Sequence, residues 1–127
     1  MDTISTLFAG RIDRKNYAIG IFLTLVVYLL TSTAITFFSD SLSYSFSNSI
    51  LVCATVLFSA SLHIRRFHDR GDSGWGILFM FIPIVGLVFF LILLFEKGEK
   101  IENKYGRAIS RDAKLLDVLL GKTELVK

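Results

Sequence analysis

Three long apolar runs dominate the pattern of hydrophobic and polar positions along the chain. They cover residues 16–39, 41–64 and 73–95, and none of them contains Lys, Arg, Asp or Glu. A helix needs about 20 apolar residues to cross roughly 30 Å of hydrocarbon, and all three runs are long enough. A soluble core explains them poorly, because helices that are apolar all round would need partners on every face. We therefore predict an all-α integral membrane protein. Its three transmembrane helices are expected over about residues 17–38, 49–64 and 75–95.

The second run does not have to end at its last apolar residue. Its helix is expected to continue through residues 63–70 into the headgroup region. Gly71 is expected to stop it, because glycine is common just past a helix C-terminus, and Gly74 is expected in the following turn. Before the second run, residues 40–49 alternate Ser with apolar side chains. Because an isolated strand would be unpaired, we predict a loop here that runs into a helix.

The third run contains the only proline, Pro83, with Gly86 close behind. A proline inside a helix removes one backbone hydrogen bond and clashes with the preceding turn. We therefore predict a third span that is kinked at Pro83, and we assign both residues a structural role. In the alternative, the run is re-entrant: it enters the membrane and returns, and neighbouring helices cover its bare backbone groups.

Short amphipathic segments flank the three runs. The apolar residues of segment 1–15 follow a helical spacing, and segment 112–120 places its leucines on one side of a helix. We expect both to lie along the membrane interface as short helices. The first run is longer than the apolar core of a signal peptide and lacks a clear cleavage site, so we expect it to be retained. The chain then divides into a membrane domain, residues 1–107, and a short amphipathic C-terminal tail, residues 108–127.

Lys and Arg residues bear on the orientation, because cytoplasmic segments of membrane proteins collect them. Three precede the first span, none lies between the first two spans, three lie between the second and the third, and eight follow the third. Three crossings put six on one side and eight on the other, whereas a re-entrant third run puts all fourteen on one side. Because an apolar run of that length usually spans, we predict three crossings with a cytoplasmic tail.

Composition narrows the class of partner. The 127 residues are 53% hydrophobic with a net charge of +3, and the mean hydropathy is +0.60. The basic residues gather at the ends of the apolar runs, which suits anionic lipid headgroups better than nucleic acid. The expected partners are the lipid bilayer and its anionic phospholipids, with a second copy of the chain or another membrane protein as further candidates. The single cysteine, Cys53, excludes a disulfide within one chain.

Four motifs lie along the chain in a fixed order. Phe8–Tyr17 is similar to the signature G-R-x-x-R-x-x-Y, and Arg65–Trp75 is similar to R-R-L-H-D-x-G-x-S-G-W-W. Pro83–Gly86 fits I-P-x-x-G, and Gly98–Gly106 fits G-x-x-x-x-N-x-Y-G. Together they resemble DUF805, the YhaH-like family of small bacterial inner-membrane proteins, over about residues 8–107.

The resemblance implies a multi-pass protein of the bacterial inner (cytoplasmic) membrane, and it implies no defined activity. The chain departs from the family pattern at Ala18 and Gly76, where tryptophan is usual, and at Arg107, where proline is usual. The two missing tryptophans weaken an interpretation of those positions as aromatic anchors. Tyr17 and Trp75 are therefore the side chains that we expect to anchor the protein at the membrane interface.

The polar stretch between the second and third runs is the expected binding site. Arg66 and Arg70 share a helix face, and paired guanidiniums suit a phosphate because each binds it through a bidentate fork. Arg65 and Asp69 are four residues apart and are expected to pair. Polar residues of the two flanks would join them if all of these segments lie on one side of the membrane. The predicted headgroup- or partner-binding residues are Arg11, Arg14, Arg65, Arg66, His68, Asp69, Arg70, Asn103 and Tyr105.

We expect neither a metal site nor a catalytic site. His63 and His68 are five residues apart and project from different helix faces, so they are not expected to share a metal ion. His68 and Asp69 point apart on a helix, and Ser73 lacks a partner that would activate it. We predict a non-enzymatic membrane module without a cofactor that binds anionic headgroups or a protein partner. The alternative is a small oligomeric transporter or channel, suggested by the hydroxyl-rich segment 31–36 and the proline in the third run.

Overall fold

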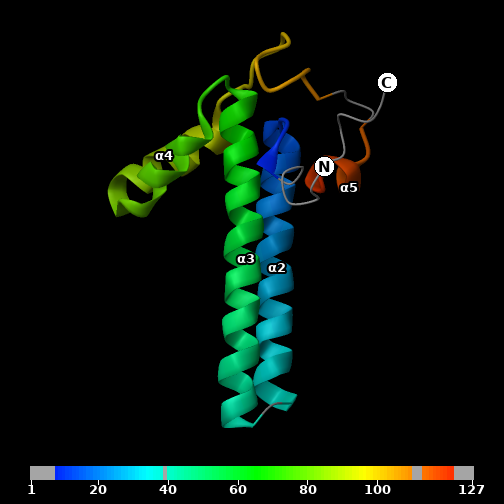
Figure 1. The fold of residues 1–127 in the computed structure, drawn as a ribbon, viewed down its shortest axis with the longest axis vertical. Helices are drawn as coiled ribbons and strands as arrows, with labels where there is room; N and C mark the ends of the chain where they lie inside the picture. Colours follow the sequence, from blue (N-terminus) through cyan, green and yellow to red (C-terminus); the bar gives the residue numbers. More distant parts are fainter. Residues whose placement is uncertain (1–7, 39, 110–112, 122–127) are drawn as a thin grey trace.

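A pair of long antiparallel helices forms the axis of the molecule (Figure 1). The structure is a computed structural model that describes residues 8–38, 40–109 and 113–121. Helix α2 spans Arg14–Phe38 and α3 spans Ser41–Asp69. All named elements within the described residues are helical, which confirms the predicted all-α class for this part of the chain. We call the end where α2 begins and α3 ends the polar end, and the opposite end the far end.

Both long helices have the length and the apolar composition to cross a membrane. Only 6% of the most apolar window of α2, and 11% of that of α3, is buried inside the protein. A core helix of a soluble protein would bury most of its apolar surface, whereas these helices present theirs to the outside. This exposure indicates a membrane protein.

Helix α3 begins earlier than the sequence pattern indicates. The Asp40 side chain caps it by accepting a hydrogen bond from the backbone N–H of Ser43 at 2.8 Å, which satisfies one of the bare donors of the first turn. The serines that follow are tolerated because a hydroxyl can bond back to its own helix, as Ser49 does to the Ser45 carbonyl at 2.8 Å. The predicted loop over residues 40–49 is therefore wrong, because this segment is helical from Ser41 onward.

The other end of α3 agrees with the prediction. The helix passes beyond its apolar part and ends at Asp69. Gly71 follows with a φ of 78°, a left-handed conformation that glycine adopts without the strain other residues would suffer. Its N–H donates to the His68 carbonyl at 3.1 Å, and the chain turns away from the helix there.

The third apolar run does not form the single kinked helix that we predicted. It begins as a 3₁₀ helix, η1, over Gly74–Phe81, breaks at the extended residue Ile82, and continues as α4 over Pro83–Phe95. Pro83 is the first residue of α4, a position where its missing N–H leaves no hydrogen bond unmade. With 13 residues, α4 is about 20 Å long, which is shorter than the hydrocarbon core of a bilayer.

The two arms of this run fold back on each other as a hairpin. In Figure 1 the chain leaves the top of α3, runs outward through η1 and returns through α4 to the same end of the molecule. Gly86 allows the close approach, because a Cβ at this position would overlap the Met80 carbonyl. The Phe79 and Phe89 rings stack across the hairpin with centroids 5.4 Å apart. Both ends of the third run therefore lie at the polar end of the helix pair.

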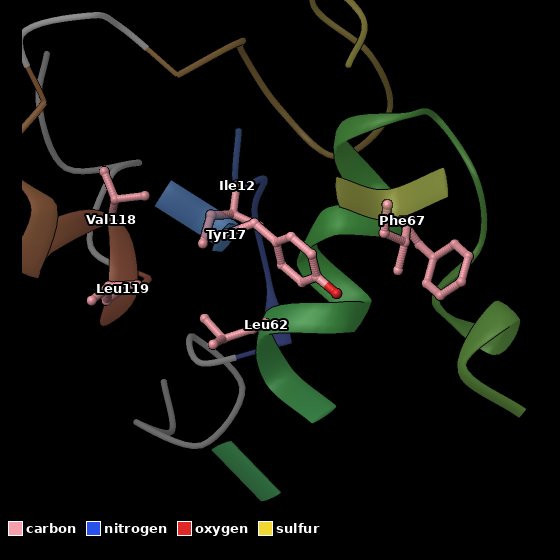
Figure 2. Packing of buried hydrophobic residues seen from close by; sticks show 7 residues of the cluster. Ile12, Tyr17, Leu62, Phe67, Val118 and Leu119 are labelled. Carbon is pink, nitrogen blue, oxygen red and sulfur yellow. The ribbon is translucent and has the colours of Figure 1, made fainter. Parts of the chain in front are cut away.

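The buried core lies at the polar end as well. It contains seven side chains: Ile12, Tyr17, Leu62, Phe67, Leu93, Val118 and Leu119. Figure 2 shows the Tyr17 ring in the middle, with the side chains of the short helix α5, Leu115–Leu119, on one side and Phe67 on the other. The core thus joins the N-terminal segment, both long helices, α4 and the tail.

Several expectations for the flanks are corrected by this core. Helix α5 buries Val118 and Leu119 inside the protein, so the tail does not simply lie along a membrane surface. Tyr17 is buried beside α3 rather than placed as an interfacial anchor, because α5 and the N-terminal segment cover it. Ile12 is buried and residues 11–13 are not helical. Of the predicted terminal helices, residues 1–7 and residue 112 lie outside the described residues.

Candidate functional site

Three arginine side chains are buried at the polar end. The exposed fractions of Arg11, Arg65 and Arg66 are 1%, 0% and 0%, and the carboxylate-bearing Asp69 beside them is 3% exposed. Burying a guanidinium is costly unless each of its N–H groups finds an acceptor. The contacts of the three arginines therefore explain how the fold tolerates them.

Arg11 joins the N-terminal segment to α3 and to the loop after α4. Its Nε donates to Asp69 Oδ1 at 3.0 Å, and its Nη1 donates to the carbonyl of Ile101 at 2.8 Å. Further bonds reach the carbonyls of Gly106 at 3.2 Å and of Glu99. One side chain thus fixes segments that lie far apart in the sequence.

Arg66 joins α3 to the end of α4. Its Nε donates to the Leu93 carbonyl at 2.8 Å, and its Nη2 donates to the Glu96 carbonyl. Its Nη1 forms an ion pair with Asp69 Oδ2. The last carbonyls of a helix have no partner within the helix, so Arg66 satisfies groups that the end of α4 leaves bare.

Arg65 holds the tail in the same way, by donating to carbonyls at the end of a helix. It donates to the Leu119 carbonyl at 2.9 Å and to the Val118 carbonyl, both at the end of α5. It also approaches the Arg11 carbonyl at 3.5 Å. Its Nε is buried and has no hydrogen-bond partner among the described residues. A five-residue helix is not stable alone, so this clamp and the buried Val118 and Leu119 side chains keep α5 in place.

This network corrects two details of the predicted site. Asp69 pairs with Arg66 and Arg11, and not with Arg65, whose side chain turns toward α5. Arg66 and Arg70 do not form an open pair of guanidiniums, because Arg66 is buried and Arg70 forms ion pairs with Glu96 at 2.8 Å and Asp72 at 3.6 Å. The sequence pattern missed this because most acceptors are backbone carbonyls, which no residue type reveals.

The motif residues of the tail meet the central stretch. The His68 and Tyr105 rings stack with centroids 3.7 Å apart and planes inclined by 7°. The Asn103 side chain donates to the His68 carbonyl at 3.0 Å and to Glu99 Oε2 at 2.7 Å. His68 Nδ1 lies 3.2 Å from the Gly10 carbonyl. The structure thus brings three of the four motif segments together, and ligand binding by them stays a prediction.

A cleft opens beside this network, next to the first turn of α2. Its volume is about 760 Å³. Among the described residues, four exposed cationic side chains line it: Arg14, Lys15, Lys97 and Lys100. Of these, sequence reasoning singled out Arg14 alone. The lysines carried a weak signal, since each stands near the end of an apolar run, but only the hairpin of the third run brings the two pairs together.

The other features considered in the sequence analysis are the candidate metal ligands, the hydroxyls of segment 31–36 and Trp75. Among the described residues, no three His, Cys, Asp or Glu side chains gather as metal ligands. The hydroxyls of segment 31–36 bond to their own helix, as Thr31 does to the Val27 carbonyl at 2.6 Å and Thr33 to the Leu29 carbonyl at 2.7 Å. Trp75 is 76% exposed at the start of η1, and its anchoring role stays a prediction.

The fold and this site define a small helical membrane protein whose polar segments are gathered at one end. A family model described as DUF805, protein of unknown function, matches residues 5–107. The chain therefore belongs to the DUF805 family, which confirms the resemblance seen in its motifs. Searches of curated proteins and of solved structures find no match to the chain.

Proposed function

We propose that this protein is a non-enzymatic module of the bacterial inner membrane that binds anionic phospholipid headgroups at its polar end. The observation that carries the proposal is the cluster of exposed cations at the boundary of the apolar helices. Arg14, Lys15, Lys97 and Lys100 form no ion pair within the part of the chain that the structure describes. Unpaired cations at this depth attract anionic headgroups, by about 1 kcal/mol each.

The buried arginines have a different role in this proposal. The guanidinium groups of Arg11, Arg65 and Arg66 donate their hydrogen bonds to backbone carbonyls and to Asp69. They form the rigid support that holds the N-terminal segment, the loop after α4 and the tail against α3. The exposed cations attached to those segments are thereby kept at one face, where a lipid headgroup can meet several of them together.

The arrangement also supports a membrane topology. The N-terminal segment, the end of α3 and the loop after α4 are joined by Arg11 and Asp69, which supports a topology with all three on one side of a membrane. In the proposed topology α2 and α3 cross, and the η1–α4 hairpin enters and returns. All Lys and Arg residues of the described chain then share one side, which the charge rule assigns to the cytoplasm.

Side-specific labelling tests this topology. Single cysteines replace Ser45, Ser73 or Ala108 in a chain whose Cys53 has been replaced, and a membrane-impermeant thiol reagent is added to intact cells. We expect labelling at Ser45→Cys alone, because that residue lies at the far end. Labelling of only one of Ser73→Cys and Ala108→Cys in intact cells contradicts the one-sided arrangement, whereas labelling of both without Ser45→Cys contradicts its cytoplasmic orientation. Labelling of all three after lysis is the control for reactivity.

Spin-labelled lipids test the binding function. The protein is reconstituted in phosphatidylcholine membranes with either spin-labelled phosphatidylglycerol or spin-labelled phosphatidylcholine. We expect a larger immobilised fraction of the anionic lipid, and we expect the difference to shrink at high salt because salt screens exposed charges. Equal immobilised fractions of the two lipids at low salt contradict the proposed function.

A further inference from the structure

We propose that the basic cleft and an apolar groove deeper along the helices form one phospholipid site. The lipid phosphate lies among Arg14, Lys15, Lys97 and Lys100, and part of one acyl chain lies between α2 and α3. This inference rests on the proposed function and deepens it, because it replaces a general attraction to anionic membranes by a defined site. The ligand class is a diacyl phospholipid with an anionic headgroup.

The cleft favours an anion although carboxylates also line it. Each of these carboxylates has a partner within the protein. Asp13 accepts a hydrogen bond from the Asn16 side chain at 2.6 Å, Glu99 accepts one from Asn103 at 2.7 Å, and Asp69 is held by Arg11 and Arg66. The four cations of the cleft have no such partner among the described residues. A phosphate is the group that would complete their hydrogen bonding, since Arg and Lys both bind it well.

The groove has a volume of about 300 Å³ and lies between the two long helices. Its walls are Gly20, Leu23, Thr24, Val27, Leu51, Ala54, Thr55, Phe58 and Leu119. The two hydroxyls in this set are turned inward on their own helices: Thr24 donates to the Gly20 carbonyl at 2.7 Å, and Thr55 donates to the Leu51 carbonyl at 2.8 Å. The groove therefore presents an apolar surface, which suits a hydrocarbon chain.

The cleft and the groove lie at the depths that the headgroup and an acyl chain of a phospholipid would occupy. Arg14 and Lys15 stand in the first turn of α2, where the apolar run has not yet begun. On α2, the groove begins at Gly20 and reaches Val27, a distance of about 10 Å along the helix. The charged part of the site thus lies at the membrane boundary, and the apolar part lies on the membrane side of it.

Helix α5 borders both parts. Leu115 lines the cleft, and Leu119, one helical turn further, lines the groove and packs on Gly20. A lipid in the cleft would therefore have the apolar groove on the other side of the same short helix. A free phosphate ion would use the cleft alone and would leave this groove unoccupied, which is why we assign the site to a lipid.

Native mass spectrometry of the full chain in mild detergent tests the cleft. The probe is dioleoyl phosphatidylglycerol, with dioleoyl phosphatidylcholine for comparison. The variant Lys97→Gln/Lys100→Gln removes two cations from the cleft, and Lys104→Gln/Arg107→Gln removes two exposed cations that do not line it. We expect one phosphatidylglycerol bound per chain, about thirtyfold weaker in the cleft variant and less than twofold weaker in the control. Equal weakening in both variants overturns the site.

A second pair of variants tests the groove. Ala54→Phe fills it from α3, and Val56→Phe places the same ring on the same helix outside the groove. We expect Ala54→Phe alone to weaken the binding of dioleoyl phosphatidylglycerol. The headgroup compound without acyl chains, glycerophosphoglycerol, is expected to compete poorly. Equal effects of the two variants, or competition by glycerophosphoglycerol or inorganic phosphate at the concentration of the lipid, overturn the assignment to a lipid.

The failure of this site and the failure of the proposed function are distinguishable. If the anionic lipid is preferred over phosphatidylcholine but both double variants lose affinity alike, the function stands and the defined site is wrong. If the wild-type chain shows no preference between the two lipids, both proposals are wrong. If only the cleft and groove variants lose phosphatidylglycerol, both proposals are supported.

Discussion

The polar end of the α2–α3 pair buries three arginines, an aspartate and a core of apolar side chains, whereas the far end buries almost nothing. At the far end, Phe37 and Phe38 are 79% and 91% exposed, and the hydroxyl of Thr36 bonds to its own helix. The polar end is therefore held by contacts between segments distant in sequence. The far end is held by helix hydrogen bonds, and its apolar side chains need a bilayer to cover them.

This difference teaches where the stability of the protein resides. Lipid tails are as apolar as the side chains of α2 and α3, so contact between these helices removes little surface from water. At the polar end, by contrast, an acceptor that is lost leaves a buried charge without a partner. Substitutions at the polar end should therefore affect the free energy of unfolding far more than substitutions at the far end.

The largest effect is expected for Asp69→Asn. This change removes the one carboxylate that pairs with both Arg11 and Arg66, and it leaves two buried guanidiniums without a counterion. We expect the free energy of unfolding to fall by about 3–5 kcal/mol, as measured by denaturant titration in mixed detergent micelles. Asp72→Asn is the matched control, since Asp72 is exposed and pairs only loosely with Arg70. A loss no larger than that of the control would contradict the role of Asp69 as the buried counterion of Arg11 and Arg66.

A smaller effect is expected for Arg65→Lys. Lysine keeps the charge but lacks the planar fork that reaches the carbonyls of Val118 and Leu119 together. We expect a loss of about 2 kcal/mol and a local release of α5, visible as faster amide hydrogen exchange in residues 115–119. Arg70→Lys is the control, because Arg70 does not contact the tail among its described ion pairs. Unchanged exchange in Arg65→Lys contradicts the proposed hold on α5.

The smallest effect is expected for Thr31→Val and Thr33→Val at the far end. Within the described part of the chain, their hydroxyls bond only to carbonyls of the turn before them, and valine fills nearly the same volume. We expect each change in the free energy of unfolding to stay within about 0.5 kcal/mol, with no change in lipid binding. A clear loss of stability, or a smaller particle in detergent, would show that these hydroxyls contact another copy of the chain. It would then favour the alternative hypothesis of an oligomeric transporter or channel.

The sequence by itself determined the membrane class and the two long helices. Length and apolar composition indicate both, because a bilayer demands about 20 apolar residues from any crossing helix, although they did not place the start of α3 at Ser41. The end of α3 near Gly71 was also predictable from the sequence, since the left-handed conformation at a helix end favours glycine. The motifs also identified the family, because each of them is a local pattern of residue types that the sequence shows directly.

Only the tertiary structure decided the course of the third run and the role of the arginines. A run that crosses and a run that folds back at Pro83 have the same composition, and only the fold shows the close approach of Gly86 to the Met80 carbonyl. The partners of Arg11, Arg65 and Arg66 are mostly backbone carbonyls, which every residue carries and no sequence pattern marks. The sequence therefore predicted that arginines gather at the membrane boundary. The fold decided which of them are buried as supports and which stay exposed.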